Sequence, residues 1–451
     1  MNNINRKPSS KSRKKSAVIH FDPTGKNMTS KAGLIPVVKF LDKLCFNKIF
    51  QNTVKHERGD NAIYRLEDGV FLILTGLIGG AFSISKCALL WSGCTVLQKA
   101  AGWLRVPDET TLGRLFKEVG ARQISEIETC VHVLRRKVWQ RATRAGTSKI
   151  NLVKTLWIDV DSSVKTACGK QEGVAKGYNP HKKGACSYNP QLAFCTHTKE
   201  ILQGWLRTGS AYTSNGVVEF MKQLLAQLPD TQRILFRGDS GYFVGALLDY
   251  LDSLGHGYLI KVKLKNLVTL LSAQKWKPIP GKEGWEQCSF WYCAKGWNVS
   301  RLFVAVRQKQ KVKPAKSGQI NLIEPVSYDF FCYVTTENYT PWQTHKTYGE
   351  RATSETWIEE AKSQLGLAHL KTADFLANAA LFQSAILAYN TIRWMALSSG
   401  NHQLKTWEPE SIRVHLICVA GKLLTGGGQI HIKIPADHLH AKPWEDWLAL
   451  A

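Results

Sequence analysis

Acidic side chains are scarce in this sequence of 451 residues, which holds 35 Asp and Glu against 60 Lys and Arg. The resulting formal net charge of +25 attracts polyanions, above all nucleic acid or an anionic membrane. Hydrophobic residues make up 44% and charged residues 21%, which are globular proportions and exclude a collagen-like, mucin-like or mostly disordered chain. The length allows several domains of roughly 100–200 residues each.

Long hydrophobic runs are also missing. The longest run, residues 69–84, is diluted by glycines and hydroxyl residues, whereas a membrane-spanning helix needs about 20 apolar residues. We therefore expect a buried core helix at this place and no membrane partner. No apolar segment follows the basic N-terminus, so no signal peptide is expected.

No Cys-x-x-Cys pair occurs among the 11 cysteines, and their number is odd. Zinc ribbons and zinc fingers need such pairs, so these classes are excluded. Free thiols in a reducing compartment fit the pattern, and we expect a cytoplasmic protein. Nucleic acid then remains as the expected polyanion.

The first part of the chain is basic and helical in pattern. Residues 1–20 carry Lys and Arg but no acid, which is typical of a flexible arm that contacts phosphates or of a solubilising tail. Residues 21–150 show apolar spacing of helices, with Asp108 or Thr110 as the N-cap of one of them. This region is predicted to be an all-α, helix-turn-helix-like DNA-binding domain; a plain helical core is the alternative.

An α/β pattern begins near residue 155. The predicted order of elements over residues 151–265 is β-β-β-α-β-α-β, which is the order of an RNase H-like domain and indicates a mostly parallel sheet covered by helices. The predicted strands are 155–163, 189–198, 200–208, 233–237 and 257–263, and the predicted helices are 215–228 and 242–254.

Aromatic strands and clusters of Lys and Gln interrupt this pattern over residues 266–342, which predicts a β-rich insertion. Its basic loop, which includes Lys311 and Lys313, is either a solvated loop or a DNA contact. Helices return over residues 343–400, at 347–365 and 375–396, and a C-terminal region of residues 401–451 follows with a strand at 429–434.

Two carboxylates lie two residues apart on the predicted strand 155–163. Asp159 and Asp161 therefore point to the same face of an otherwise apolar strand, where acidic residues are rare. Side by side they repel each other, and a bound Mg²⁺ or Mn²⁺ ion relieves this repulsion. The alternative is that one of them caps the following turn.

A third acid follows the apolar strand 233–237. Asp239 stands in the segment Arg237-Gly238-Asp239-Ser240-Gly241, just past the carboxyl end of the strand, where open α/β sheets bind ligands. A normal helix N-cap is the alternative interpretation of Asp239 or Ser240.

A further carboxylate lies among cations on the predicted helix 347–365. At about 100° per residue, one narrow stripe of this helix holds Tyr348, Arg351, Glu355 and Lys362. Glu355 is suited to bind a metal ion there, and the two cations and the phenol are suited to hold phosphate oxygens. A solvated face with i,i+3 and i,i+4 ion pairs is the alternative.

Together, these three segments resemble the DDE transposases of bacterial insertion sequences. The spacing from Tyr348 through Arg351 and Glu355 to Lys362 matches the Tyr-Arg-Glu-Lys signature of that group at every step. The glycine-containing stretches 169–173 and 177–179 resemble the branch named for insertion sequence thirteen-eighty. In one departure, Ser162 follows the strand's second Asp, where Thr is more usual in the family.

The resemblance implies an RNase H-like catalytic core in which Asp161, Asp239 and Glu355 hold two Mg²⁺ ions, with Mn²⁺ as a possible substitute. Asp159 is the rival of Asp161 as the first acid. The expected DNA contacts are Tyr348, Arg351, Lys362, Arg237, Lys311 and Lys313.

The activity that the resemblance implies is cut-and-paste transposition, by a homodimer that holds terminal inverted repeats and target DNA, both double-stranded, in a synaptic complex near the bacterial nucleoid. The alternatives are an RNase H-like nuclease or resolvase without strand transfer, and a DNA-binding derivative of a transposase that has lost catalysis.

Overall fold

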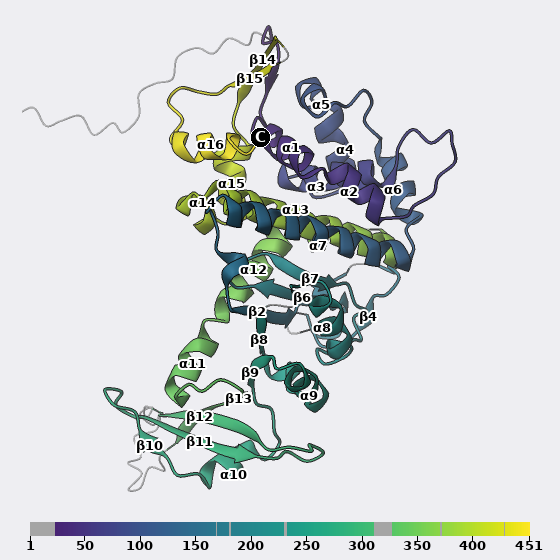
Figure 1. Ribbon diagram of the computed structural model, residues 1–451. Coiled ribbons are helices and arrows are strands. Elements are labelled where there is room, and N and C mark those ends of the chain that lie inside the picture. Colours follow the sequence, from purple (N-terminus) through teal and green to yellow (C-terminus); the bar gives the residue numbers. More distant parts are fainter. Residues whose placement is uncertain are drawn as a thin grey trace, which may run out of the picture.

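One sheet of nine strands runs through the lower two thirds of the molecule, in the order β10-β11-β12-β13-β9-β8-β2-β6-β7. A layer of helices from the N-terminal part of the chain covers one end, as the computed structural model shows (Figure 1). The structure describes residues 23–167, 169–179, 182–229, 232–310, 327–369, 372–427 and 429–451. The predicted basic arm and the loop with Lys311 and Lys313 lie outside these residues.

The five strands at one side of the sheet follow the predicted element order. Strands β2 and β8 are parallel, as are β8 and β9, while β6 runs antiparallel to both β2 and β7. Helix α8 (Val217–Leu225) connects β7 to β8, and helix α9 (Gly245–Ser253) connects β8 to β9. The strands are β2 (Thr155–Ser162), β6 (Gln191–Cys195), β7 (Ile201–Trp205), β8 (Arg233–Gly238) and β9 (Gly257–Lys261).

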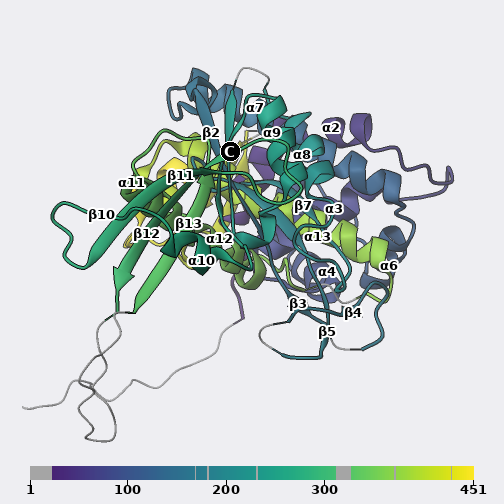
Figure 2. The ribbon, with the colours of Figure 1, turned by 90° about the horizontal axis from the view of Figure 1, so that it is seen from below.

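The connection from β2 to β6 contains a small sheet that the sequence did not predict. Its strands β3 (Lys165–Thr166), β5 (Cys186–Tyr188) and β4 (Ala175–Lys176) are antiparallel in the order β3-β5-β4. Figure 2 shows this sheet well apart from the strands β10–β13. It lies next to the carboxyl end of β2 and so contributes to the surface around that end.

The predicted β-rich insertion continues the same sheet. It contains α10 (Leu267–Ser272), β10 (Lys277–Pro278), β11 (Trp285–Tyr292), β12 (Arg301–Lys309) and β13 (Tyr328–Thr335). Only the last of these strands joins the core, since β13 pairs with β9 through three residue pairs, of which Tyr333 with Lys261 is one. Phe303 is fully buried among aromatic rings and forms the centre of the insertion's own core.

The N-terminal layer consists mainly of helices, although strand β1 (Met28–Thr29) falls within the region predicted to be all-α. Asp108 caps α6 by accepting a hydrogen bond of 2.7 Å from the backbone N–H of Thr111, which confirms one of the two predicted N-caps. Helix α3 is buried along nearly its whole length and confirms the predicted core helix in residues 69–84. The helices are α1 (Leu34–Leu44), α2 (Phe46–Thr53), α3 (Leu66–Ile78), α4 (Ile84–Ser92), α5 (Thr95–Ala101), α6 (Glu109–Lys117) and α7 (Ala121–Arg144).

Helix α13 (Phe375–Ser399) lies between the helical layer and the sheet and is buried on all sides. Among the described residues it alone is long and apolar enough to cross a membrane, but 89% of its most apolar window is buried inside the protein. Its polar side chains bind strand β7: Gln383 donates to the carbonyl of Gly204 at 2.7 Å, and Asn390 bonds both backbone groups of Ile201. The helix therefore fixes the sheet to the helical layer.

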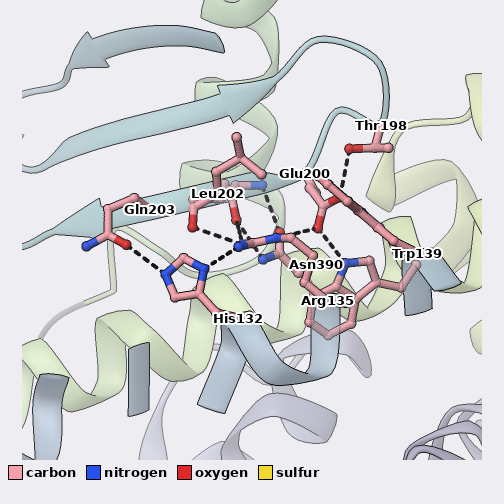
Figure 3. A network of polar contacts seen from close by, with 10 residues as sticks. His132, Arg135, Trp139, Thr198, Glu200, Leu202, Gln203 and Asn390 are labelled. Atoms are coloured by element: carbon pink, nitrogen blue, oxygen red, sulfur yellow. Dashed lines mark hydrogen bonds and ion pairs between the residues drawn. The ribbon is translucent and has the colours of Figure 1, made fainter. Parts of the chain in front are cut away.

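A buried carboxylate joins three of these elements (Figure 3). Glu200, at the start of β7, is fully buried and accepts hydrogen bonds from Arg135 at 3.0 Å and Trp139 at 2.6 Å on α7. It also accepts from Trp394 on α13 at 2.6 Å and from Thr198 at 2.8 Å. Four donors around one carboxylate compensate for its removal from water.

The predicted helix 347–365 is wrong as a single helix. Helix α11 (Pro341–Gly349) ends before Glu350, helix α12 (Ala352–Glu359) begins after Arg351, and a π-helical turn, η3 (Glu360–Gln364), follows. Backbone N–H groups of Arg351 and Ser354 bond carbonyls three residues earlier, so the chain tightens at the junction. Gly349 is a poor helix former and stands at this break.

The C-terminal region returns to the helical layer. Strand β14 (Gly421–Gly426) pairs with β15 (Gln429–Lys433), which confirms the predicted strand near 429–434, and with β1 (Met28–Thr29). The other elements are α14 (His402–Thr406), α15 (Pro409–Ile412), η4 (Arg413–Ile417) and α16 (Ala441–Leu448). All ten described cysteines are free thiols, as expected.

Candidate active site at the ends of strands β2 and β8

Asp161 and Asp239 lie side by side because their strands are parallel neighbours. The register pairs Asp159 with Arg237 and Val160 with Gly238, so the next residues along the two strands are Asp161 and Asp239. Both carboxylates line one cavity of about 640 Å³. Asp239 also caps the short 3₁₀ turn η2 (Ser240–Tyr242), where it accepts from the N–H of Gly241 at 2.9 Å. Capping and a place in the cavity are therefore compatible for this residue.

The electrostatics of Asp161 are set by burial and by charges of both signs. Burial is the main cause that raises the pKa of Asp161 to about 6; the charge of Arg351 opposes this rise, and the charges of Asp239 and Glu355 contribute to it. One backbone N–H, that of Ser162, stabilises the charged form at 2.8 Å. An added cation at this place would stabilise the ionised carboxylate.

Arg351 supplies the positive charge between the acids. Its Nη2 lies 2.9 Å from Oδ2 of Asp161, and its Nη1 lies 3.4 Å from Oε1 of Glu355. The side chain is buried, yet Nε and Nη2 have no well-directed hydrogen-bond partner among the described residues. Arg351 therefore offsets the negative charge of Asp161 and Glu355, while its Nε and Nη2 groups remain available as hydrogen-bond donors.

The break after α11 separates the other residues of the predicted stripe, Tyr348, Glu355 and Lys362. Tyr348 lies in the last turn of α11, and the centre of its ring is 4.7 Å from that of Tyr333. Burial raises the pKa of Tyr348 to about 12, so the phenol keeps its proton. Glu355 lies in the first turn of α12 with its side chain 64% exposed. Lys362 lies on η3, where its Nζ is 3.6 Å from Glu359.

Asp159 and Arg237 form a buried pair and do not fit their predicted roles. Both carboxylate oxygens of Asp159 accept from Arg237, at 2.6 and 2.8 Å, and Asp159 is fully buried. Arg237 also donates to the carbonyl of Thr347 on α11 at 2.7 Å, and its guanidinium lies 5.1 Å from the ring centre of Trp157. Arg237 is thus engaged by Asp159, Thr347 and Trp157, and both oxygens of Asp159 already accept hydrogen bonds. Neither residue lines the cavity that contains Asp161 and Asp239.

The two aspartates differ because they lie at different positions along the strand. Residues two apart share a face but lie about 7 Å apart: Asp159 meets Arg237, which is also bound to α11, while Asp161 lines the cavity. The parallel register, which places Asp159 beside Arg237, was the signal that sequence reasoning missed.

The cavity also holds residues that sequence reasoning did not select. Ser162 shares a hydrogen bond of 2.9 Å with Thr213, which ties the end of β2 to the loop after β7. Two tyrosines of the wall are largely exposed, Tyr178 at 76% and Tyr212 at 72%. Further lining residues are Ser163, Asn189, Ser214, Ser240 and Lys263.

The donor set suits a hard divalent cation, because carboxylate oxygens are its preferred ligands. Asp161 and Asp239 present such oxygens to one cavity. Within the described residues, however, no three His, Cys, Asp or Glu side chains stand close enough together to form a ready metal site. Glu355 faces Arg351, so it would have to turn to join the two aspartates.

Three comparisons relate the chain to known proteins. A chain in a cryo-EM structure of the piggyBac transposase synaptic complex with hairpin DNA is similar at 13% identity over 86% of each chain, with a TM-score of 0.39. No curated protein matches the sequence. A family model described as "Transposase DDE domain group 1" matches residues 11–450. The chain therefore belongs to the family of transposase DDE domains, group 1.

Proposed function

We propose that the protein is a DNA transposase that cuts the ends of an insertion element and joins them to target DNA by cut-and-paste transposition. Membership of the DDE family supports this function. The observation that carries it is the placement of Asp161 and Asp239 in one cavity, with Arg351 bridging Asp161 to Glu355. In this proposal the three acids are the catalytic residues.

The topology supports an RNase H-like core. Three antiparallel strands, β7, β6 and β2, are followed in space by β8 and β9, which are parallel to β2. The acids then stand at the carboxyl ends of the two central strands, where such sheets bind ligands. We assign the chain to the bacterial insertion-sequence branch on the spacing from Tyr348 through Glu355 to Lys362.

Asp161, Asp239 and Glu355 would hold two Mg²⁺ ions, for which Mn²⁺ can substitute. When bound, these ions activate the attacking oxygen and stabilise the leaving oxygen of an in-line phosphoryl transfer. Asp159 is left out of this set, because its oxygens are both engaged by Arg237.

The side chains around the acids would orient the DNA. Arg351 has unused donors that can bind phosphate oxygens, and the protonated phenol of Tyr348 can donate one hydrogen bond. Lys362 adds positive charge on η3, beyond the end of α12. Each of these groups acts on the phosphate without itself exchanging a proton.

The net charge of +25 supports double-stranded DNA as the partner, both element ends with inverted repeats and target DNA. Because two ends are joined in one event, we propose a homodimeric synaptic complex in the bacterial cytoplasm.

The experiment uses duplexes that carry the inverted repeats flanking the gene. Asp239→Asn and Glu355→Gln are expected to abolish Mg²⁺-dependent cleavage while DNA binding stays within about twofold, since neither acid should hold DNA by itself. Glu219→Gln is the matched control, because Glu219 is an exposed acid on α8 that pairs with Lys222 and lies outside the proposed triad.

Full cleavage by either triad variant would contradict the assignment. A strand-joining assay on the same proteins separates the transposase from a nuclease or resolvase, since cleavage without joining of ends to a target plasmid would favour the latter.

A further inference from the structure

Two turns of the chain are wound as π-helix, a rare conformation that is frequent at functional sites. One is η3 (Glu360–Gln364), which directly follows α12, and the other is η4 (Arg413–Ile417) in the C-terminal region. Lys362, one of the side chains that would orient the DNA, stands in the middle of η3. The contacts on either side of Lys362 therefore decide where its charge is presented.

Glu360, two residues before Lys362, is bound to the long core helix α13. It is buried, forms an ion pair with Arg393, and accepts a hydrogen bond of 3.3 Å from the hydroxyl of Tyr389. Arg393 is also buried and donates to the carbonyl of Trp407 at 2.8 Å. Because breaking a buried ion pair is costly, the first residue of η3 is held firmly against α13.

Gln364, two residues after Lys362, is bound to the C-terminal region. Its carbonyl accepts a hydrogen bond from Arg413, the first residue of η4. Its side chain donates to Glu408 at 2.7 Å and accepts from the backbone N–H of Glu410 at 2.9 Å. The two ends of η3 are therefore fixed to two different parts of the fold.

Arg413 also joins η3 to the helical layer. It is 5% exposed and donates to the carbonyls of the last two residues of α3, Ile78 at 3.1 Å and Leu77 at 3.4 Å. Its guanidinium lies 5.1 Å from the ring centre of Phe82 and pairs with Glu410. A cation at the C-terminal end of a helix interacts favourably with the carbonyls there. One arginine thus connects the last turn of α3 with the last residue of η3.

We propose that Arg413 is a positioning residue for DNA cleavage, which acts by fixing the π-helical turn that carries Lys362. Lys362 pairs with an exposed acid, Glu359, at 3.6 Å, and surface pairs of this kind hold a side chain weakly. The place of its ammonium group therefore depends on the backbone of η3, which Arg393 and Arg413 hold at its two ends.

A charge whose position is set before DNA binds stabilises the reacting phosphate without a further cost of ordering. Loss of this order should lower the rate of cleavage more than the affinity for DNA. The inference rests on the proposed function and adds to it a residue outside the cavity at the carboxyl ends of β2 and β8.

The test is single-turnover cleavage of element-end duplexes with Mg²⁺ at saturating protein, with DNA affinity measured by anisotropy without divalent metal. Arg413→Lys keeps the charge but cannot bind backbone carbonyls and a carboxylate at once, because an ammonium group lacks the planar fork of donors. We expect it to lower the rate constant of cleavage about tenfold, with an affinity within about twofold of the wild type. Gln364→Ala, which removes only the side-chain bonds to α15, should lower the rate by a smaller factor.

A double-mutant cycle shows whether Arg413 acts through Lys362. In a protein that already carries Lys362→Ala, Arg413→Lys should lower the rate constant by no more than about twofold, because the group through which it acts is gone. A merely structural role would give the same fold-loss in both backgrounds. Gln364→Ala in the same two backgrounds decides the question if Arg413→Lys does not fold.

Arg135→Lys is the matched control. Like Arg413, Arg135 is buried, pairs with a carboxylate and donates to two backbone carbonyls, but it lies between α7 and β7 (Figure 3). Urea unfolding should show that both lysine variants are less stable than the wild type. At a temperature where circular dichroism shows both to be folded, only Arg413→Lys should cleave slowly.

Three results would overturn the proposal. The first is a wild-type rate of cleavage in Arg413→Lys or in Lys362→Ala, the second is additive losses in the double-mutant cycle, and the third is an equal loss of rate in Arg135→Lys. Any of these results in a protein that cleaves and joins element ends refutes only the positioning role. A wild-type protein that neither cleaves nor joins element ends refutes the transposase assignment itself.

Discussion

Replacing each of the two strand aspartates by asparagine should have opposite effects. Asp159 is the two-oxygen partner of the buried Arg237, whereas Arg351, the partner of Asp161, also lies near Glu355. Asp159→Asn leaves Arg237 charged and buried, with an amide N–H₂ in place of one oxygen that it binds at 2.6 and 2.8 Å. Breaking a buried pair in this way costs about 3–5 kcal/mol of unfolding free energy. Asp161→Asn removes a carboxylate whose ionisation is already unfavourable.

The magnitude for Asp161 follows from its pKa of about 6 against an ordinary value of 3.8. A group whose pKa is higher in the folded state holds its proton longer there, so its stabilising contribution is lost as pH rises from about 4 to about 6. At neutral pH ionised Asp161 thus costs up to about 3 kcal/mol, and this net value already includes its attraction to Arg351. We expect Asp161→Asn to be more stable than the wild type by up to about 3 kcal/mol.

The assay is urea unfolding of both variants at several pH values, together with cleavage of element ends. Asp161→Asn should lose cleavage without losing stability, and its advantage over the wild type should grow between about pH 4 and about pH 6. Asp159→Asn should lose stability at every pH in this range. The reasoning is refuted if Asp161→Asn cleaves normally, or if Asp159→Asn abolishes cleavage with an unchanged free energy of unfolding.

Two further changes test how the core is held. Glu200→Gln, which leaves Arg135 buried without its carboxylate partner, should lower the free energy of unfolding by about 3–5 kcal/mol in urea, and an effect below about 1 kcal/mol would contradict the network of Figure 3. Burial raises the pKa of Glu128 to about 7, so the stability it contributes is present below about pH 4.5 and lost as pH rises through about 7. Glu128→Gln should therefore flatten this decline, and a pH profile identical to the wild type's would count against it.

Local patterns in the sequence predicted the element order of the core and the N-cap of α6, because strands, helices and caps depend on neighbouring residues. The same reasoning could not separate Asp159 from Asp161. Their difference comes from Arg237, which is distant in sequence, lies beside Asp159 through the parallel register and also binds the carbonyl of Thr347 on α11. To decide which of two acids on one strand belongs to the active site, one must know how that strand pairs with its neighbours in the sheet.

The break between α11 and α12 is a second case. A helical wheel over residues 347–365 assumes a single helix axis. In the structure the helix is interrupted at Glu350 and Arg351, between α11, which packs on the insertion, and α12, which packs on the core. Likewise, the aromatic segments between clusters of Lys and Gln indicated the strands of the insertion. The pairing of β13 with β9 could not be predicted from the sequence of either strand alone. Which strands pair over long distances depends on how their side chains pack with their neighbours in the folded protein.

The two-residue turn after α11 also places two of the proposed functional side chains on helices with different supports. Helix α11 packs on β11, β12 and β13 of the insertion and on β9 of the core, whereas α12 is anchored where Trp357 meets Phe194 with ring centres 6.0 Å apart. Arg237 of β8 also donates to the carbonyl of Thr347 on α11. The position of Tyr348 relative to Glu355 therefore depends on the insertion as well as on the catalytic sheet, although the insertion contributes none of the acids.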